Sequence, residues 1–264
     1  MNALLFDLDG VLYQGEQSIS GARETLAWVQ QQAIPHLFVT NTTSRPRSAL
    51  VSKLASMGIT IQPSQLVTPA VAACHWMKHN VRSDGDIALF IPQKTSSEFQ
   101  QFSLARAGQT TNIAAVVVGD LGEQWDFHTL NQAFRLLMTD PPPALIALGM
   151  TRYWLAEDGL RLDAGPYVSA LQYATGRSPV VLGKPALLFY QAALQQLRVP
   201  AHQVYMIGDD IRGDIDGAQK AGIKALLVKT GKFQATDLQL GILPNSCLDS
   251  VADLPRWWQA NVTN

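Results

Sequence analysis

The chain has 264 residues, of which 47% are hydrophobic and 16% charged, and its formal net charge is −1. This composition is typical of a packed soluble protein and argues against binding to nucleic acid or to a membrane surface. No apolar run approaches the ~20 residues of a membrane span, and the N-terminus shows no signal-peptide pattern. The two cysteines, Cys74 and Cys247, provide no disulfide framework and favour a reducing, cytoplasmic location.

An apolar run near the N-terminus predicts the first buried strand. Leu4-Leu5-Phe6 is too short for a helix, and it is followed by Asp7, Asp9 and Gly10. In an open α/β sheet, ligands bind outside the carboxyl ends of the strands, where buried acids are costly unless a ligand uses them. A metal ion with a phosphoryl group would use these acids, whereas an Asx-rich turn after an edge strand is the alternative.

The second predicted strand also ends in polar side chains. A helix over 22–32 leads to a strand over 36–40. This strand finishes in Thr40 and Asn41, ahead of a helix that begins near Pro46. Free backbone N–H groups at a helix N-terminus bind anions, so this strand end is a candidate phosphate site. An ordinary Ser/Thr N-cap is the alternative.

Residues 82–177 contain enough elements for a compact domain of their own. A polar break at 82–85 precedes them and marks a predicted domain boundary. We therefore expect a core domain formed by residues 1–81 and 178–264, with the middle domain inserted into it. The elements predicted in the middle domain are strands over 87–91, 113–118 and 144–148, helices over 96–107, 127–138 and 166–174, and a hairpin over 152–162 with Asp158-Gly159 as its turn.

Two strands in the last part of the chain end in charged side chains. One leads to Gly183-Lys184-Pro185, which lacks the upstream glycine and the Ser/Thr of a P-loop. A strand over 204–207 leads to Asp209, Asp210 and Asp214, whose spacing is not that of an EF-hand. The remaining predicted elements are helices over 187–199 and 215–221 and a strand over 223–228.

Four strands of one α/β pattern thus end in side chains suited to phosphate and metal chemistry. Each end alone is a weak signal, but the carboxyl ends of the strands converge on one crevice. The acids suit a hard cation, the hydroxyl and amide groups suit an anion, and the lysine supplies positive charge. The set consists of Asp7, Asp9, Thr40, Asn41, Lys184, Asp209, Asp210 and Asp214.

These strand ends resemble the four motifs of the haloacid dehalogenase (HAD) superfamily of phosphohydrolases, in the same order and over nearly the whole chain. The matching stretches are Asp-Leu-Asp-Gly-Val-Leu-Tyr at 7–13, Val-Thr-Asn at 39–41, Gly-Lys-Pro at 183–185 and Gly-Asp-Asp-Ile-Arg-Gly-Asp at 208–214. The resemblance implies a Rossmann-like α/β core with a parallel sheet. The interval between Thr40 and Lys184 far exceeds the ~30 residues of a βαβ unit, so a smaller inserted α/β cap domain of the C2 type is expected there.

A large cap at this point resembles subfamily IIA, which includes NagD-like nucleotide phosphatases and pyridoxal phosphate phosphatases. Within that subfamily, the stretches 165–185 and 228–232 resemble a branch that contains phospholysine, phosphohistidine and inorganic pyrophosphate phosphatases. The substrate itself stays open, because cap loops select it and the fold does not.

The resemblance implies catalytic and metal-binding roles for the aspartates. Asp7 would be the nucleophile that forms an aspartyl-phosphate, and Asp9 would act as general acid and base. Mg²⁺ would bind the carboxylates of Asp7 and Asp209 and the backbone carbonyl of Asp9. Asp210 or Asp214 would support the metal ligands, and the motif does not rank them. The dehalogenases lack the second aspartate, which argues against carbon–halogen cleavage.

Phosphate and substrate recognition are expected from other positions. Thr40, Asn41 and Lys184 would neutralise the oxygens of the transferring phosphoryl group. Thr151 and Arg152 follow the third strand of the expected cap, and the arginine fork suits an anionic part of the substrate. The alternative is that these two residues merely begin a surface hairpin.

The sequence therefore predicts a Mg²⁺-dependent phosphatase for a small soluble phosphorylated compound. A phosphotransferase or mutase with the same phosphoenzyme is one alternative, and a non-catalytic phosphate-sensing module is another. The expected partner is a small-molecule phosphate substrate, and the oligomeric state stays open with a homodimer as one alternative. If Arg152 does not select the substrate, the loop over 119–121 is the next candidate.

Overall fold

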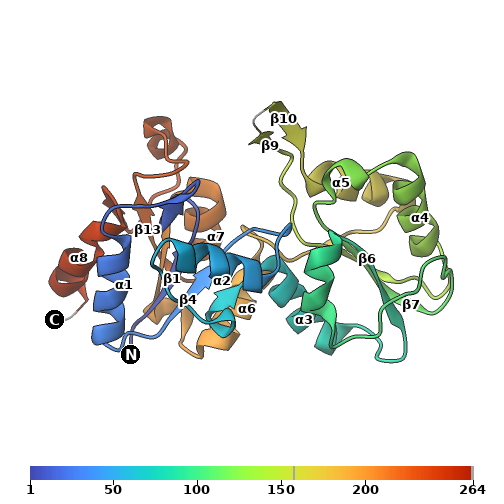
Figure 1. Cartoon of the computed structure of the whole chain (residues 1–264), viewed down its shortest axis with the longest axis horizontal. Coiled ribbons are helices and arrows are strands. Elements are labelled where there is room, and N and C mark those ends of the chain that lie inside the picture. Colours follow the sequence, from blue (N-terminus) through green and yellow to red (C-terminus); the bar gives the residue numbers. More distant parts are fainter. Residues whose placement is uncertain (157, 263–264) are drawn as a thin grey trace. The chain divides into compact units, whose positions relative to one another are not determined.

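The computed structural model describes residues 1–156 and 158–262, and only the backbone of Leu155. The chain divides into two compact units, each with a parallel sheet of its own (Figure 1). The first unit comprises Met1–Thr40, Ser48–Val67 and Lys184–Asn264, and the second comprises Asn41–Arg47 and Thr68–Gly183. Within the described residues, no helix combines the length and the apolar character that a membrane crossing requires.

The elements alternate between strands and helices, as the predicted α/β class requires. The strands of the first unit are β1 (Ala3–Asp7), β2 (Tyr13–Gln14), β3 (Gln17–Ser18), β4 (His36–Val39), β5 (Leu66–Val67), β12 (Val204–Gly208), β13 (Lys224–Val228) and β14 (Ser246–Leu248). Its helices are α1 (Ala22–Gln31), α2 (Arg47–Ser56), α6 (Leu187–Leu197), the π-helix η5 (Ile211–Asp216), α7 (Gly217–Lys220) and α8 (Leu254–Asn261), with short 3-10 turns at Pro63–Gln65, Ala201–Gln203, Ala235–Gln239 and Val251–Asp253.

The second unit has the same alternation. Its strands are β6 (Asp86–Phe90), β7 (Ile113–Val118), β8 (Ala144–Ala147), β9 (Tyr153–Ala156), β10 (Gly159–Leu162) and β11 (Val180–Val181). Its helices are α3 (Pro69–Asn80), the 3-10 helix η2 (Gln93–Phe99), α4 (Phe127–Leu137) and α5 (Ala164–Thr175), with a 3-10 turn at Gly122–Gln124.

β1 lies inside the first sheet, whose strand order is β14-β13-β12-β1-β4-β5. All neighbouring strands are parallel, and Phe6 of β1 pairs with Ile207 of β12 and Phe38 of β4. Every residue of β1 is buried, which explains why this strand is a continuous apolar run rather than an alternating one. Because the strands are parallel, their carboxyl ends meet at one edge of the sheet, and Asp7 lies there.

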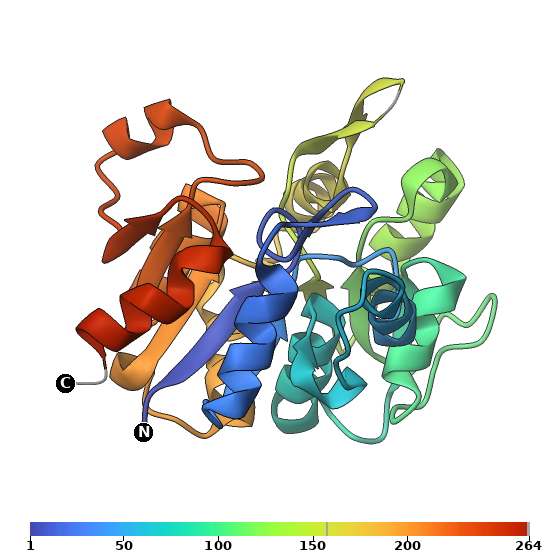
Figure 2. The ribbon, with the colours of Figure 1, turned by 60° about the vertical axis from the view of Figure 1, so that its left-hand side comes forward.

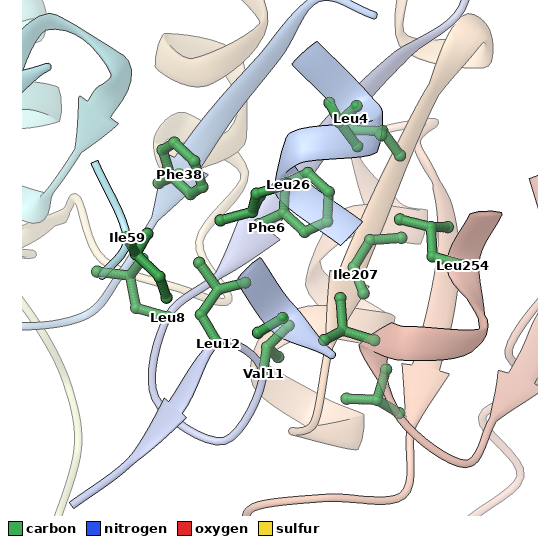
Figure 3. Packing of buried hydrophobic residues seen from close by; sticks show 14 of the residues in the cluster. Leu4, Phe6, Leu8, Val11, Leu12, Leu26, Phe38, Ile59, Ile207 and Leu254 are labelled. Carbon is green, nitrogen blue, oxygen red and sulfur yellow. The ribbon is translucent and has the colours of Figure 1, made fainter. Parts of the chain in front are cut away.

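Helices α1 and α8 cover one face of this sheet (Figure 2). The buried cluster beneath them includes Phe6 from β1, Leu26 from α1 and Leu254 from α8 (Figure 3). Each large apolar side chain that is fully buried contributes about 1.5–3 kcal/mol to stability. This packing fixes β1, and with it the position of Asp7.

The second sheet has the order β11-β8-β7-β6, and its strands are again all parallel. Trp125 stacks on Phe90 and on Tyr167 in the core of this unit, with ring centroids 6.0 Å and 4.7 Å away. The two aromatic stacks connect three parts of the unit, namely β6, the segment that precedes α4, and helix α5. The second unit therefore has a hydrophobic core of its own.

The second unit is wider than the domain predicted over 82–177, because α3, the segment Asn41–Arg47 and residues 178–183 also belong to it. Residues 178–183 were predicted in the core domain, but they contain β11, which pairs with β8 of the second sheet. α3 packs against η2, where the thiol of Cys74 donates to the carbonyl of Glu98 at 3.3 Å. The backbone N and the side-chain Nε of Arg47 donate to the two carboxylate oxygens of Glu98, at 2.8 Å and 2.7 Å. Both segments are therefore tied to η2, and neither contact is visible in the sequence pattern.

Two predicted helices differ from the structure. The helix predicted over 96–107 is wrong, because the residues after η2 run alongside β6. There the N–H of Ile87 donates to the carbonyl of Ser103, and the N–H of Ala105 donates to the carbonyl of Ile87. This pairing with a strand overrides the local helix propensity. The helix predicted over 215–221 starts earlier, as the π-helix η5.

Two further elements are the β9–β10 hairpin, which forms a small sheet of its own, and the edge strand β14 of the first sheet. The predicted hairpin is present, with Tyr153 of β9 opposite Leu162 of β10, and Glu157 within the predicted range lies outside the described residues. β14 was not predicted, because Ser246-Cys247-Leu248 is too short for a clear apolar pattern. It pairs in parallel with β13 at the edge of the first sheet.

Candidate active site

Three parallel strands of the first unit end in candidate residues. Asp7 is the last residue of β1, Thr40 directly follows β4, and Asp209 directly follows β12. β1 pairs with both neighbours, so the three ends lie side by side at the carboxyl edge of the sheet. All three residues are buried, with exposed fractions of 6%, 4% and 1%. Asn41 follows Thr40 and begins the segment that groups with the second unit.

Lys184 joins two of the buried aspartates. Its Nζ donates to Oδ1 of Asp7 at 2.7 Å and to Oδ1 of Asp214 at 2.6 Å. Burial alone lowers the pKa of Lys184, but the carboxylates of Asp214 and Asp7 together outweigh burial and raise this pKa above its ordinary value. The ammonium is therefore charged, and it neutralises part of the negative charge at the sheet edge.

Three buried carboxylates lie close together, and Lys184 binds two of them. One oxygen from each of Asp7, Asp209 and Asp214 lies within 4.8 Å of the others. Burial, and then repulsion from Asp7 and Asp214, raises the pKa of Asp209 to about 7. Burial also raises the pKa of Asp214 to about 6, although Lys184 acts to lower it. A further cation at this point would relieve the excess of negative charge.

One carboxylate oxygen of Asp209 accepts a hydrogen bond, and the other accepts none from the described residues. Its Oδ2 accepts the backbone N–H of Lys232 at 2.6 Å. Its Oδ1 is buried, and the described residues offer it no hydrogen-bond partner. Gly10 and Gly231 enclose the other oxygen, since a Cβ on either glycine would lie 2.1 Å from Asp209 Oδ2. The carboxylate is thus held with Oδ1 available, and a set of carboxylate oxygens fits a hard divalent cation.

Asp210 and Asp214, which the motif left unranked, make different contacts. Asp210 caps the π-helix η5, because its Oδ1 accepts the N–H groups of Arg212 and Gly213 at 3.0 Å and 2.8 Å. Asp214 is fully buried, and its Oδ2 accepts the N–H of Asp210 at 3.2 Å while its Oδ1 accepts from Lys184. Asp214 therefore belongs to the buried charge cluster, whereas Asp210 shapes the loop.

Asp9 differs from the other aspartates of the site, because it is exposed as a residue. Protein atoms packed around its carboxylate raise its pKa, and the negative charge of Asp7 raises it further. A carboxyl group that holds its proton more firmly than usual, two positions after Asp7, is suited to donate and accept protons.

Three residues that the sequence analysis gave no role also contact the site. The hydroxyl of Thr230 donates to the carbonyl of Gly10, and Gly231 and Lys232 contact Asp209 as described above. They follow β13, so the same rule of polar residues at strand ends applies to them. Thr151 and Arg152, predicted to select the substrate, are exposed in the second unit at the base of the hairpin.

Comparison with known proteins identifies the class of this fold and site. A family model described as haloacid dehalogenase-like hydrolase matches residues 4–105, and one described as HAD-hydrolase-like matches residues 181–254. Phospholysine phosphohistidine inorganic pyrophosphate phosphatase from Homo sapiens is 39% identical over 241 residues, covering 90% of this chain and 86% of the relative.

Two further similarities agree with this result. Haloacid dehalogenase-like hydrolase domain-containing protein 2 from Mus musculus is 37% identical over 238 residues, covering 90% of this chain and 87% of the relative. The crystal structure of a hypothetical protein from Pyrococcus horikoshii OT3 superimposes with a TM-score of 0.89 at 28% identity, covering 97% and 99% of the two chains. The chain therefore belongs to the haloacid dehalogenase-like hydrolases. The predicted placement in subfamily IIA of this superfamily is confirmed.

Proposed function

We propose that the protein is a Mg²⁺-dependent phosphatase that hydrolyses a small soluble phosphorylated compound through an aspartyl-phosphate on Asp7. One observation carries the proposal: Asp209 Oδ1 is buried beside the carboxylate of Asp7, and no described residue offers it a hydrogen bond. Burying such an oxygen without a partner lowers the stability of the fold, and a bound cation would offset that loss. Membership of a hydrolase family, with a curated relative named as a phosphatase, supports this reading.

The chain's own groups divide the chemistry between them. Lys184 holds Oδ1 of Asp7, so we assign the other oxygen, Oδ2, to the attack on phosphorus. Asp9 gives its proton to the leaving oxygen and later takes one from the attacking water. Bound Mg²⁺, held by the carboxylates of Asp7 and Asp209 and the backbone carbonyl of Asp9, would neutralise charge on the phosphoryl oxygens.

The remaining predicted residues hold the phosphoryl group and select the substrate. Thr40, Asn41 and Lys184 are assigned to the phosphoryl oxygens, because each offers a donor or a positive charge. The second unit is assigned to substrate selection, with Thr151 and Arg152 as the proposed selecting residues. The two free cysteines fit a cytoplasmic location.

The test is turnover of an aryl phosphate by the purified protein. We expect phosphate release with Mg²⁺, loss of release when a chelator removes the metal, and recovery when Mg²⁺ is restored. Undiminished turnover in excess chelator contradicts the metal assignment. Transfer of phosphate to an added alcohol in excess of transfer to water would favour a phosphotransferase. Binding of phosphate without any turnover would favour a sensing module.

A further inference from the structure

The segment Thr230–Lys232 is fixed at the active site by its own backbone and by close packing. The N–H of Lys232 donates to Oδ2 of Asp209, and the hydroxyl of Thr230 donates to the carbonyl of Gly10. A Cβ at Gly231 would lie 2.4 Å from the Cα of Gly10, so the two backbones are in direct contact. The side chain of Lys232 therefore starts from a fixed point at the carboxyl edge of the sheet.

Among the described residues, the ammonium of Lys232 makes one long ion pair, which contributes little to the fold. Its Nζ lies 3.8 Å from Oδ2 of Asp210, and 70% of the side chain is exposed. An exposed ion pair at this distance adds little to stability. The loop does not need it either, because Oδ1 of Asp210 already accepts two backbone N–H groups. The charge is thus available to a ligand.

Two other lysines near the aspartates are held closely by protein groups. Lys184 lies between two carboxylates, and 6% of its side chain is exposed. Lys53, which acts on Asp9 together with Lys232, pairs with Glu16 at 3.1 Å and lies over the ring of Tyr13 at 4.6 Å. Compared with these two, Lys232 combines a fixed backbone with a loosely held and exposed ammonium.

The backbone N–H of Lys232 is bound to Asp209, and the positive charge of its side chain acts to lower the pKa of Asp9. The ammonium therefore lies near the acid that the proposed function assigns to proton transfer. Under the proposed function, Asp9 lies on the side of the leaving group. A cation on that side would interact with a leaving group that carries negative charge of its own, and would gain little from a neutral one. Cleavage of a phosphoanhydride has this character. The bridging P–O bond breaks as Asp7 attacks, and the departing phosphate keeps the electron pair and takes the proton of Asp9.

We propose that Lys232 is a specificity-determining residue, and that its ammonium binds the anionic leaving group of a phosphoanhydride or a comparable substrate. The inference rests on the proposed phosphatase function and adds to it a selecting residue in the first unit.

The test compares inorganic pyrophosphate with phenyl phosphate, whose leaving group is neutral before cleavage. Lys232→Met removes the ammonium but keeps the backbone N–H on Asp209 and a side chain of similar length. We expect kcat/KM for pyrophosphate to fall about tenfold, the size of one partly exposed contact between opposite charges, and kcat/KM for phenyl phosphate to fall less. Lys232→Arg should retain the preference. Lys229→Met is the matched control, since Lys229 pairs with Asp249 at 2.8 Å, and it should change neither value.

A binding measurement separates recognition from chemistry. The dissociation constant of methylenediphosphonate, a non-cleavable analogue of pyrophosphate, should rise about tenfold in Lys232→Met when measured by calorimetry with Mg²⁺ present. Equal losses on both substrates, or no loss on either, overturn the assignment. A selective loss in Lys53→Met instead of Lys232→Met would also overturn it.

The activity of the wild-type protein distinguishes a wrong role for Lys232 from a wrong proposed function. A wild-type protein that cleaves phenyl phosphate but neither cleaves pyrophosphate nor binds the analogue refutes the role of Lys232 and leaves the phosphatase intact. A wild-type protein that turns over no phosphate compound refutes both.

Discussion

The two units have similar sheets but use the ends of their strands differently. In the first unit, Asp7 and Asp209 at the strand ends are buried, and both lie near the carboxylate of Asp214. In the second unit, Asp120 follows β7 but is only half-buried, and its Oδ1 accepts the nearby N–H of Gly122 at 2.9 Å. Among the described residues, the first unit thus buries charged side chains at its strand ends, whereas Asp120 of the second unit is half-buried.

This difference indicates that the proposed active site lies in the first unit. A buried carboxylate without compensation destabilises the fold, so a cluster of three persists only where cations compensate it. A half-buried aspartate that accepts a local N–H has an ordinary turn contact. Substitutions in the charge cluster of the first unit should therefore have larger effects on turnover than a substitution in the second unit.

The largest effect is expected from Asp7→Asn. An amide is not a nucleophile, so turnover should fall by about 10⁴-fold or more. The measurement is acid-quenched labelling with a radioactive phosphate donor, which should label the wild-type protein and not the variant. Asp158→Asn, which removes an exposed partner of Arg161 in the second unit, is the control and should be labelled normally. Label on the Asp7→Asn protein would contradict the nucleophile assignment.

The next effect is expected from Lys184→Ala, which removes the buried cation and leaves Asp7 and Asp214 without it. Loss of one group that stabilises a developing charge lowers the rate by about 10²–10³-fold. We expect the variant to remain folded with a lower melting temperature, and Mg²⁺ to raise that temperature more than in the wild type. The reason is that the metal would compensate carboxylates that Lys184 no longer neutralises.

Lys220→Ala is the control for this experiment. Lys220 pairs with Asp216 in the same unit, but 68% of its side chain is exposed. Its removal should change stability by no more than about 1 kcal/mol and leave turnover intact. Near-normal turnover in Lys184→Ala would make Lys184 a structural residue only.

A smaller effect is expected from Gly231→Ala. Gly231 has a φ of +61°, and a Cβ there would meet Asp209 Oδ2 at 2.1 Å and the Cα of Gly10 at 2.4 Å. The substitution should displace Asp209 and weaken the binding of Mg²⁺, measured by calorimetric titration. Gly241→Ala is the matched control, since Gly241 has a φ of +76° and open space around its Cβ position.

The two glycine variants separate backbone strain from the effect on the site. A left-handed residue other than glycine costs roughly 1–2 kcal/mol, and both variants should show this loss in denaturant unfolding. Only Gly231→Ala should also lose affinity for the metal. Equal Mg²⁺ affinities in the two variants would contradict the view that Gly231 helps to hold Asp209.

Much of the charged site could be predicted because its residues follow apolar runs. Asp7, Thr40 and Asp209 each come after a predicted strand of the first sheet, where strand ends converge. The prediction that Lys184 ends a strand of the same sheet is wrong, because β11 before it pairs with β8 of the second sheet. The separation of Asp210 from Asp214 could not be predicted in this way. It depends on the turn of the π-helix η5, which brings the carboxylate of Asp214 to Lys184.

The features that the sequence did not indicate depend on contacts between distant segments. The grouping of α3 and Arg47 with the second unit depends on Glu98, which both contact. The residues after η2 leave their helical pattern because they pair with β6. Thr230 and Lys232 lie in the stretch 228–232, whose resemblance to a phosphatase branch assigned them no role, and only their contacts with Gly10 and Asp209 show their place.

The smallest effect is expected in the second unit, from Arg152→Ala. Arg152 is exposed, and its guanidinium lies 5.7 Å from the ring centroid of Tyr153. If it selects the substrate, its loss should raise KM for the natural substrate about three- to tenfold and leave kcat nearly unchanged, the pattern of lost uniform binding. A small aryl phosphate should be affected little. Arg161→Ala in the same hairpin, which removes surface pairs with Asp158 and Glu123, is the control. Equal losses on both substrates, or none on either, would transfer the selecting role to another loop, with residues 119–121 next.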